Sequence, residues 1–197
     1  MKKLSHIFYA LLICLFCVGT GVAQTTKAEK KVQKAEELKR IINEKNFVFK
    51  ANSAMPTPIA SMQVSGSLPP NSILNQLNSG MISLTSASYD VKFANDSLTA
   101  FLPYYGQAYS APYNSPTESG IKFTSTKFDY TVTQKKKGIL EILIIPHDLS
   151  SRAPSDVQRM MLTVSEGGWA NLQITLLTRQ RISFSGTIEE IKPKPTS

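Results

Sequence analysis

The stretch MMLTVSEGGWANLQITLLTRQRISFSGTI, residues 160–188, alternates apolar and polar side chains with a period of two. Successive side chains of a β-strand point to opposite faces, so the pattern predicts strands with one buried and one wetter face. Residues 166–168 and 178–180 interrupt the alternation and are typical of turns. Because short connections favour antiparallel neighbours, the stretch predicts three adjacent strands of an antiparallel sheet.

Segments upstream extend this sheet. Residues 89–93 and 97–102 alternate on either side of Asn95-Asp96, which predicts a β-hairpin. Further strands are expected at residues 47–53, 121–123, 127–133 and 139–145, with a basic turn at 134–138. The last of these strands is the most apolar, so we expect it to be central or covered on both faces. We therefore predict a mainly β fold, α+β at the margin: an antiparallel β-sandwich or partly closed barrel of about eight strands.

An amphipathic helix precedes the sheet, within residues 24–46. Thr26 and Glu29 have capping-box spacing, and apolar residues recur at helical spacing at Ala28, Val32, Ala35, Leu38, Ile41 and Ile42. The apolar stripe is dense only in its second half, which we expect to dock on the sheet. A single β domain at 47–191 follows, with a tail at 192–197 that we expect to be disordered.

The β domain contains a long segment at residues 54–80, rich in Pro, Ser and Asn. Connections of this length inside compact domains are usually functional or mobile. We interpret it as a surface insertion that would serve as a lid.

The first 23 residues have the features of a secretory signal peptide. Lys2 and Lys3 precede a short apolar run at residues 7–18, and small residues at 21–23 suit a cleavage site. An uncleaved anchor and a lipoprotein acylated at Cys14 or Cys17 are the alternatives. Cleavage would leave no transmembrane span and an exported chain, periplasmic or in the cell envelope.

Composition argues against several function classes. The mature chain would hold no cysteine and only one histidine, His147, which argues against thiolate and zinc chemistry. The formal net charge is +8, but residues 27–45 alone hold seven Lys or Arg against four Glu. That mixed-sign helix lies apart from the tyrosines in sequence, so we predict no nucleic-acid partner. We also predict no metal site, no cofactor and no assigned catalytic residue.

The run FLPYYGQAYSAPY at residues 101–113 is more particular than a generic fold needs. It supplies five candidate ligand-binding residues: Tyr104, Tyr105, Gln107, Tyr109 and Tyr113. Such amphipathic aromatics form either a packed bend at a sheet edge or a recognition surface for sugar, peptide or protein. A concave pocket beside Tyr105 and Tyr109 would favour recognition. We expect Trp169 to pack on the core as a hairpin residue.

Several short motifs are distributed along the chain: NFVF at 46–49, YDV at 89–91, NDS at 95–97, LPYYGQAYSAP at 102–112, GIKF at 120–123 and RQRISFSG at 179–186. In these motifs the chain resembles a bacterial family of secreted proteins, domain-of-unknown-function family 4251. The resemblance covers roughly residues 28–190. Two departures are the longer 54–80 segment and Gln107, where a basic residue is expected. The resemblance implies an envelope or periplasmic location and no assigned activity.

Three functions follow as hypotheses. The first is a non-enzymatic binding or interaction module that uses the aromatic loop to bind a small molecule, peptide or envelope protein. The second is a structural or assembly accessory of the envelope that docks through the basic N-terminal helix. The third, which we disfavour, is a hydrolase centred on His147 with Asp148 and Ser150 or Ser151, because neighbours on one strand point to opposite faces.

Overall fold

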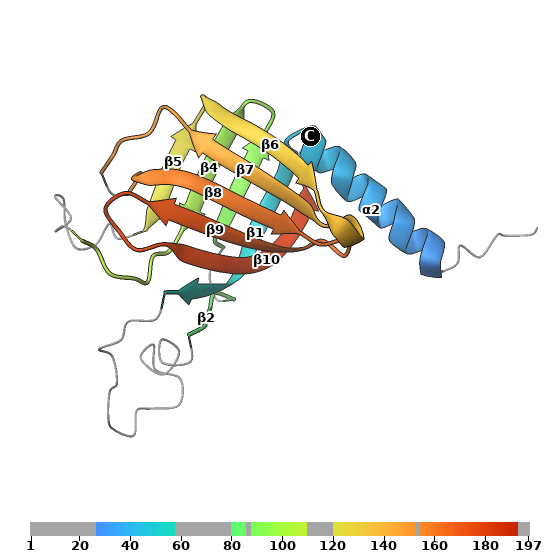
Figure 1. Ribbon diagram of the computed structural model, residues 1–197, viewed down its shortest axis with the longest axis horizontal. Helices are drawn as coiled ribbons and strands as arrows, with labels where there is room; N and C mark the ends of the chain where they lie inside the picture. Colours follow the sequence, from blue (N-terminus) through green and yellow to red (C-terminus); the bar gives the residue numbers. More distant parts are fainter. Residues whose placement is uncertain (1–26, 58–79, 86–87, 110–119, 153, 193–197) are drawn as a thin grey trace, which may run out of the picture. The chain divides into compact units, whose positions relative to one another are not determined.

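The computed structural model describes residues 27–57, 80–85, 88–109, 120–152 and 154–192 (Figure 1). The chain divides into two compact units, Met1–Lys30 and Lys31–Ser197, and the fold below is that of the second unit. The expected signal peptide, most of the 54–80 insertion, Tyr113 and most of the expected tail lie outside the described residues. What the sequence predicts for them stays a prediction.

The strands form one antiparallel sheet that curls into a nearly closed barrel. Nine strands follow one another in the order β5-β4-β3-β1-β10-β9-β8-β7-β6, and a short strand, β2, pairs with β1 off this path. Figure 1 shows β6 to β10 side by side as one curved wall. The elements are helix α2 (Lys27–Asn43), β1 (Asn46–Pro56), β2 (Ile82–Ser83), β3 (Asp90–Ala94), β4 (Ser97–Leu102), β5 (Ile121–Ser125), β6 (Phe128–Gln134), the 3-10 turn η1 (Lys136–Gly138), β7 (Leu140–Pro146), β8 (Val157–Val164), β9 (Trp169–Leu176) and β10 (Ile182–Glu190). The predicted mainly β antiparallel fold is confirmed as a barrel, with nine strands along the path.

The barrel interior is filled by the apolar half of each alternating strand. Burial alternates along β7, β9 and β10, so every second side chain points inward. The centre holds stacked aromatic rings, with the centroids of Phe47 and Phe93 4.6 Å apart. The largest side chains with almost no exposure include Phe47, Phe49, Phe93, Phe184, Ile142 and Ile144. The inside of the barrel is therefore a packed core, and a ligand site must lie on its outside or at its ends.

The two edge strands of the sheet, β5 and β6, are consecutive in the chain, with only Thr126 and Lys127 between them. The carboxylate of Asp148, just after β7, accepts hydrogen bonds from the hydroxyl of Ser125 and from the backbone N–H groups of Thr126 (2.8 Å) and Lys127 (3.2 Å). Asp148 thus holds in place the connection between the two edge strands of the nearly closed barrel.

Replacing Asp148 with asparagine should lower the unfolding temperature, and the difference from wild type should shrink as the pH falls from about 5 to about 2. The hydrogen bonds from Ser125 and Thr126 lower the pKa of Asp148 from 3.8 to about 2. A carboxyl with a depressed folded-state pKa stabilises above its unfolded pKa and loses that contribution as the pH falls through the folded value. Thermal unfolding followed by circular dichroism across this range measures the effect. A difference that does not change with pH would show that the Asp148 charge is unimportant.

Helix α2 docks through its C-terminal half, as the density of the apolar stripe predicts. Leu38, Ile41 and Ile42 are buried in the barrel's core cluster. The hydroxyl of Tyr130 on β6 donates to the carbonyl of Ile42 near the helix end (2.8 Å), and the same carbonyl accepts from the backbone N–H of Lys45 (3.2 Å). Burial of this ring raises the pKa of Tyr130. Before this docked half, residues 31–34 of α2 are exposed.

Two boundaries and the environment of one strand differ from those expected. The helix ends at Asn43 because Lys45 adopts a left-handed backbone (φ 52°) that turns the chain into β1. Strand β1 continues three residues beyond Ser53, through Pro56, because its end pairs with both β2 and β10. The apolar strand β7 is next to the edge strand β6, and its second face is partly exposed, so it is not covered on both faces.

Candidate functional site

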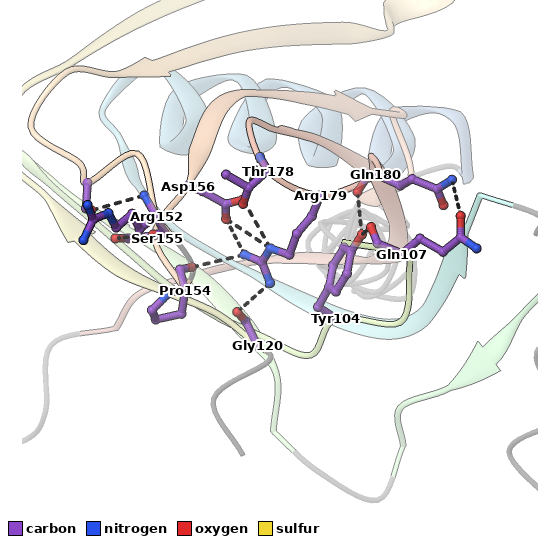
Figure 2. A network of polar contacts seen from close by, with 11 residues as sticks. Tyr104, Gln107, Gly120, Arg152, Pro154, Ser155, Asp156, Thr178, Arg179 and Gln180 are labelled. Atoms are coloured by element: carbon purple, nitrogen blue, oxygen red, sulfur yellow. Dashed lines mark hydrogen bonds and ion pairs between the residues drawn. The ribbon is translucent and has the colours of Figure 1, made fainter. Parts of the chain in front are cut away.

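A buried ion pair joins several connections at one end of the barrel. Arg179, between β9 and β10, contacts Asp156, which directly precedes β8, and their side chains are 4% and 0% exposed. The guanidinium also donates to the carbonyl oxygens of Gly120 (3.1 Å) and Pro154 (3.4 Å), as Figure 2 shows. The ion pair therefore ties together the chain segments that enter β5, β8 and β10.

Hydrogen bonds and the neighbouring guanidinium keep the buried carboxylate of Asp156 ionised. Burial opposes its ionisation, but hydrogen bonds from Arg179 and Thr178 and the charge of Arg179 outweigh burial. The pKa of Asp156 therefore lies below its ordinary value of 3.8. The hydroxyl and the backbone N–H of Thr178 both donate to the carboxylate. Asp156 is thus an ionised anchor for the β9–β10 connection.

Tyr104 lies over this ion pair. Its ring centroid is 4.5 Å from the guanidinium carbon of Arg179, and its hydroxyl donates to the carbonyls of Gln107 (2.8 Å) and Gln180 (3.0 Å). Burial raises the pKa of Tyr104 to about 12, although the charge of Arg179 opposes this. The phenol therefore stays protonated and keeps donating its hydrogen bonds at any physiological pH.

The backbone of the tyrosine run pairs with the β9–β10 connection. Ala108 forms an isolated antiparallel bridge with Arg179. On either side of it, Tyr109 N–H donates to the carbonyl of Thr178 (2.8 Å) and Gln180 N–H donates to the carbonyl of Gln107 (2.9 Å). Residues 178–180, where the sequence predicts a turn, connect β9 to β10 and also support residues 104–109 through these backbone hydrogen bonds.

The five candidate residues have different environments. Tyr104 and Gln107 both contact the β9–β10 connection: the hydroxyl of Tyr104 donates to the carbonyl of Gln180, and the side-chain oxygen of Gln107 accepts from the Gln180 amide (3.3 Å). Tyr105 is partly buried against the core cluster, whereas Tyr109 is 72% exposed. Tyr113 lies outside the described residues. Tyr104 and Gln107 therefore help to hold the run on the β9–β10 connection, and ligand binding by any of the five residues stays a prediction.

Tyr105 lies close to Tyr89, which belongs to a pair of stacked aromatic rings. The rings of Tyr89 and Phe101 stack with centroids 5.6 Å apart, and the ammonium of Lys122 lies 5.1 Å from the Phe101 centroid. Burial raises the pKa of Tyr105, and the neighbouring phenol of Tyr89 adds to the shift. We call Tyr89, Phe101 and Tyr105 the aromatic wall. Phe101 is 43% exposed, so the wall presents apolar ring surface to solvent.

A pocket of about 330 Å³ opens beside the aromatic wall. Tyr89 belongs to both, whereas neither Tyr105 nor Tyr109 is among the described residues that line the pocket. Its lining residues are Lys50, Ala51, Asn52, Leu84, Thr85, Ser88, Tyr89 and Asp90. The site therefore combines flat aromatic surface with charged, hydroxyl and amide groups of both hydrogen-bonding types.

His147 does not form, with Asp148 and Ser150, the constellation on which the disfavoured hydrolase hypothesis depends. Its Nε2 lies 3.0 Å from the carboxylate of Asp129 on β6, and both side chains are at least half exposed. Asp148 binds the β5–β6 connection instead, and the hydroxyl of Ser150 accepts from the backbone of Arg152. Among the described residues no serine hydroxyl bonds to the imidazole. The described residues therefore do not bring together His147, Asp148 and Ser150 as the hydrolase hypothesis would require.

The expectation that Trp169 packs on the core is wrong, because its side chain is 66% exposed. It begins β9 beside the buried Ala170, and the period of two places Trp169 on the outer face. Sequence reasoning also missed Asp156, Arg179 and Tyr89. Two of the motifs quoted above nevertheless marked positions among them, since YDV begins at Tyr89 and RQRISFSG begins at Arg179.

The described ranges contain no cluster of three or more His, Cys, Asp and Glu side chains placed to hold a metal ion. No helix in the same ranges combines the length and apolar character that crossing a bilayer requires.

Fold and site define a class: a small antiparallel β-barrel with one N-terminal helix and a pocket lined mostly by polar residues beside a pair of stacked aromatic rings. The family described as "Domain of unknown function (DUF4251)" matches residues 29–188, and the chain belongs to this family. No activity is assigned to it. Comparison with curated proteins gave no significant match.

Proposed function

We propose that this protein is an exported, non-enzymatic binding module whose ligand lies on the aromatic wall and in the adjoining pocket. The observation that supports this most is the stacked pair Tyr89 and Phe101, which borders an open pocket of about 330 Å³. Exposed aromatic rings beside a few convergent polar groups are typical of recognition sites.

The chemistry of the site indicates the kind of ligand. The aromatic wall can pack against a flat, weakly polar face of a ligand. Beside it, Lys50, Asn52 and Asp90 offer an ammonium, an amide and a carboxylate for hydrogen bonds. Lys50 is engaged with Glu189 at 2.6 Å and Asp90 with Lys92 at 3.3 Å, both on the exterior, where such pairs contribute little to stability. A ligand can therefore replace these partners at low cost. The best fit is a small molecule or short peptide with an apolar face and hydrogen-bonding groups along one edge.

The buried ion pair contributes to this function by holding the wall in place. Arg179 supports Tyr104, and the next residue in the chain, Tyr105, belongs to the wall. A site whose side chains are already ordered loses less conformational entropy on binding. The ion pair and hydrogen bonds around Arg179 therefore order residues 104–109 before a ligand binds.

Alanine substitution at Phe101 or Tyr105 should weaken ligand binding about tenfold or more, because buried aromatic anchors carry much of the affinity in such sites. The wild-type mature chain is first screened on glycan and peptide arrays, and the hits are titrated by calorimetry. Thr124→Ala is the matched control, since Thr124 is an exposed residue on β5, two residues beyond Lys122. Retention of full affinity in both folded aromatic variants would refute the site.

The alternative function, envelope docking through the basic helix, rests on the exposure of its first half, where Val32 is 57% exposed. Deleting residues 26–40 would also remove the buried Leu38 and so confuse docking with folding. Charge reversal at Lys34 together with Lys39 tests docking with the apolar contacts intact. Unchanged envelope association of that variant would argue against this function.

A further inference from the structure

A second hollow lies between α2 and the ends of the β6–β7 and β8–β9 hairpins. It has a volume of about 430 Å³. Its apolar surface comes from Val32 and Ala35 on the helix and from Leu140 at the start of β7. We call this hollow the helix groove. It shares no lining residue with the pocket beside the aromatic wall.

The helix groove continues the docked apolar stripe of α2 toward the helix N-terminus. Val32 and Ala35 precede Leu38 at spacings of three residues, so the three side chains lie on one face of the helix. Leu38 is 6% exposed, whereas Val32 is 57% exposed. The stripe therefore leaves the barrel at Ala35, and apolar surface that α2 would otherwise bury faces the groove.

Two lysines of the helix reach across the groove to the hairpins. The ammonium of Lys31 lies 2.8 Å from the carboxylate of Glu166, and that of Lys39 donates to the side-chain oxygen of Gln134 (3.0 Å). The lysines are two helical turns apart, about 12 Å along the axis. Both contacts are solvent-exposed and therefore weak, so an anionic ligand can take over either lysine.

The charges around the groove favour an anion. Glu36 and Glu166 also line it, and Glu166 already pairs with Lys31. The neighbouring hairpin tip adds three consecutive lysines at 135–137, of which Lys135 pairs with Glu141 (3.1 Å). Counting Lys31 and Lys39, the positive groups outnumber the negative ones.

We propose that the helix groove binds a small anionic amphiphile, a medium-chain carboxylate, with its chain on Val32, Ala35 and Leu140 and its headgroup on Lys31 or Lys39. This site is independent of the aromatic wall. Its ligand has an apolar chain and one negative charge. The mixed polar groups beside the aromatic wall do not select that combination.

The test titrates the mature chain with hexanoate, octanoate and decanoate below their self-association concentrations, by calorimetry and by fluorescence. Trp169, the single tryptophan of the sequence, follows Glu166 by three residues and is the fluorescent reporter. Each added methylene should tighten binding roughly fourfold if the chain is buried in the groove. Decyltrimethylammonium, which carries the opposite charge, should bind at least tenfold more weakly than decanoate.

Ala35→Phe should fill the groove and abolish decanoate binding. Gln33→Phe adds the same ring at an exposed helix position outside the groove and should leave binding unchanged. The double variant Lys31→Met, Lys39→Met should weaken decanoate and spare decyltrimethylammonium. Phe101→Ala should have no effect, which separates this site from the aromatic wall.

Three results would overturn the proposal. They are no decanoate binding in the wild type, equal binding in the Ala35→Phe variant, and a wild-type dimer that this variant dissociates while decanoate has no effect. The last would show that a second copy of the chain covers the groove. Circular dichroism of each variant verifies that it is folded.

Discussion

Replacing Arg179 with methionine should lower the free energy of unfolding by about 3–5 kcal/mol, the range for removing one partner of a buried ion pair. Methionine fills much of the same space, so the loss is chiefly electrostatic. It leaves the carboxylate of Asp156, which is 0% exposed, without its cation. The carbonyls of Gly120 and Pro154 lose a donor as well. Urea denaturation followed by circular dichroism measures the change.

Companion variants separate the ion pair from simple packing. Arg179→Lys should recover only part of the loss, because an ammonium cannot reproduce the forked contacts of a guanidinium. Asp156→Asn should be destabilising too, and the double variant Arg179→Met, Asp156→Asn should cost less than the sum of the single variants. Additive costs, or a loss below about 1 kcal/mol for Arg179→Met, would show that the pair is not coupled.

The same substitution should loosen the aromatic loop. Tyr109 N–H donates to Thr178, next to Arg179, so its hydrogen exchange reports on the pairing between the loop and the β9–β10 connection. In the Arg179→Met variant we expect exchange of the Tyr109 N–H to accelerate more, relative to wild type, than exchange of the amides in the β3–β4 hairpin.

The wild type should lose the stability contributed by Asp156 in acid. Because the folded-state pKa of Asp156 is depressed, its contribution is complete above the unfolded pKa and is lost as the pH falls through the folded pKa.

Replacing Gly186 with alanine should destabilise the barrel by about 3 kcal/mol or more, at or above the upper range for overpacking a core. Gly186 lies on β10 and pairs with Ala51 of β1 just where the register of β1 shifts. A methyl group added at Gly186 would overlap the carbonyl oxygen of Lys50. Since that atom belongs to the backbone, β1 and β10 would have to separate at the centre of the sheet.

Gly167→Ala is the matched control for this substitution. A methyl group there would lie 3.6 Å from a ring carbon of Trp169, an ordinary contact, and Gly167 is not among the residues with positive φ. Its stability should change by less than about 1 kcal/mol, with a slight gain from reduced entropy of the unfolded chain. Equal unfolding midpoints for the two variants would mean that the close approach of β1 and β10 is unimportant.

The class of fold was accessible from residue patterns alone. Alternation in residues 160–188 requires strands with one inward face, and Asn95-Asp96 between two such strands requires a hairpin, because these are local consequences of backbone geometry. The docking of α2 through Leu38, Ile41 and Ile42 followed in the same way from helical periodicity. Even the exposure of Trp169 could have been read from its position beside Ala170.

Closure and the site depended on tertiary structure. The sheet curls into a barrel and not a sandwich because β1 pairs with β10. This pairing places Phe47 opposite Glu190, although most of the chain separates the two residues in sequence, and no local pattern specifies it. Arg179 is a charged residue in a predicted turn, and it is buried only because Asp156, Gly120 and Tyr104 converge on it from other segments. Residue patterns determine which face of each element is apolar, whereas the pairing of distant segments decides which polar groups are enclosed together.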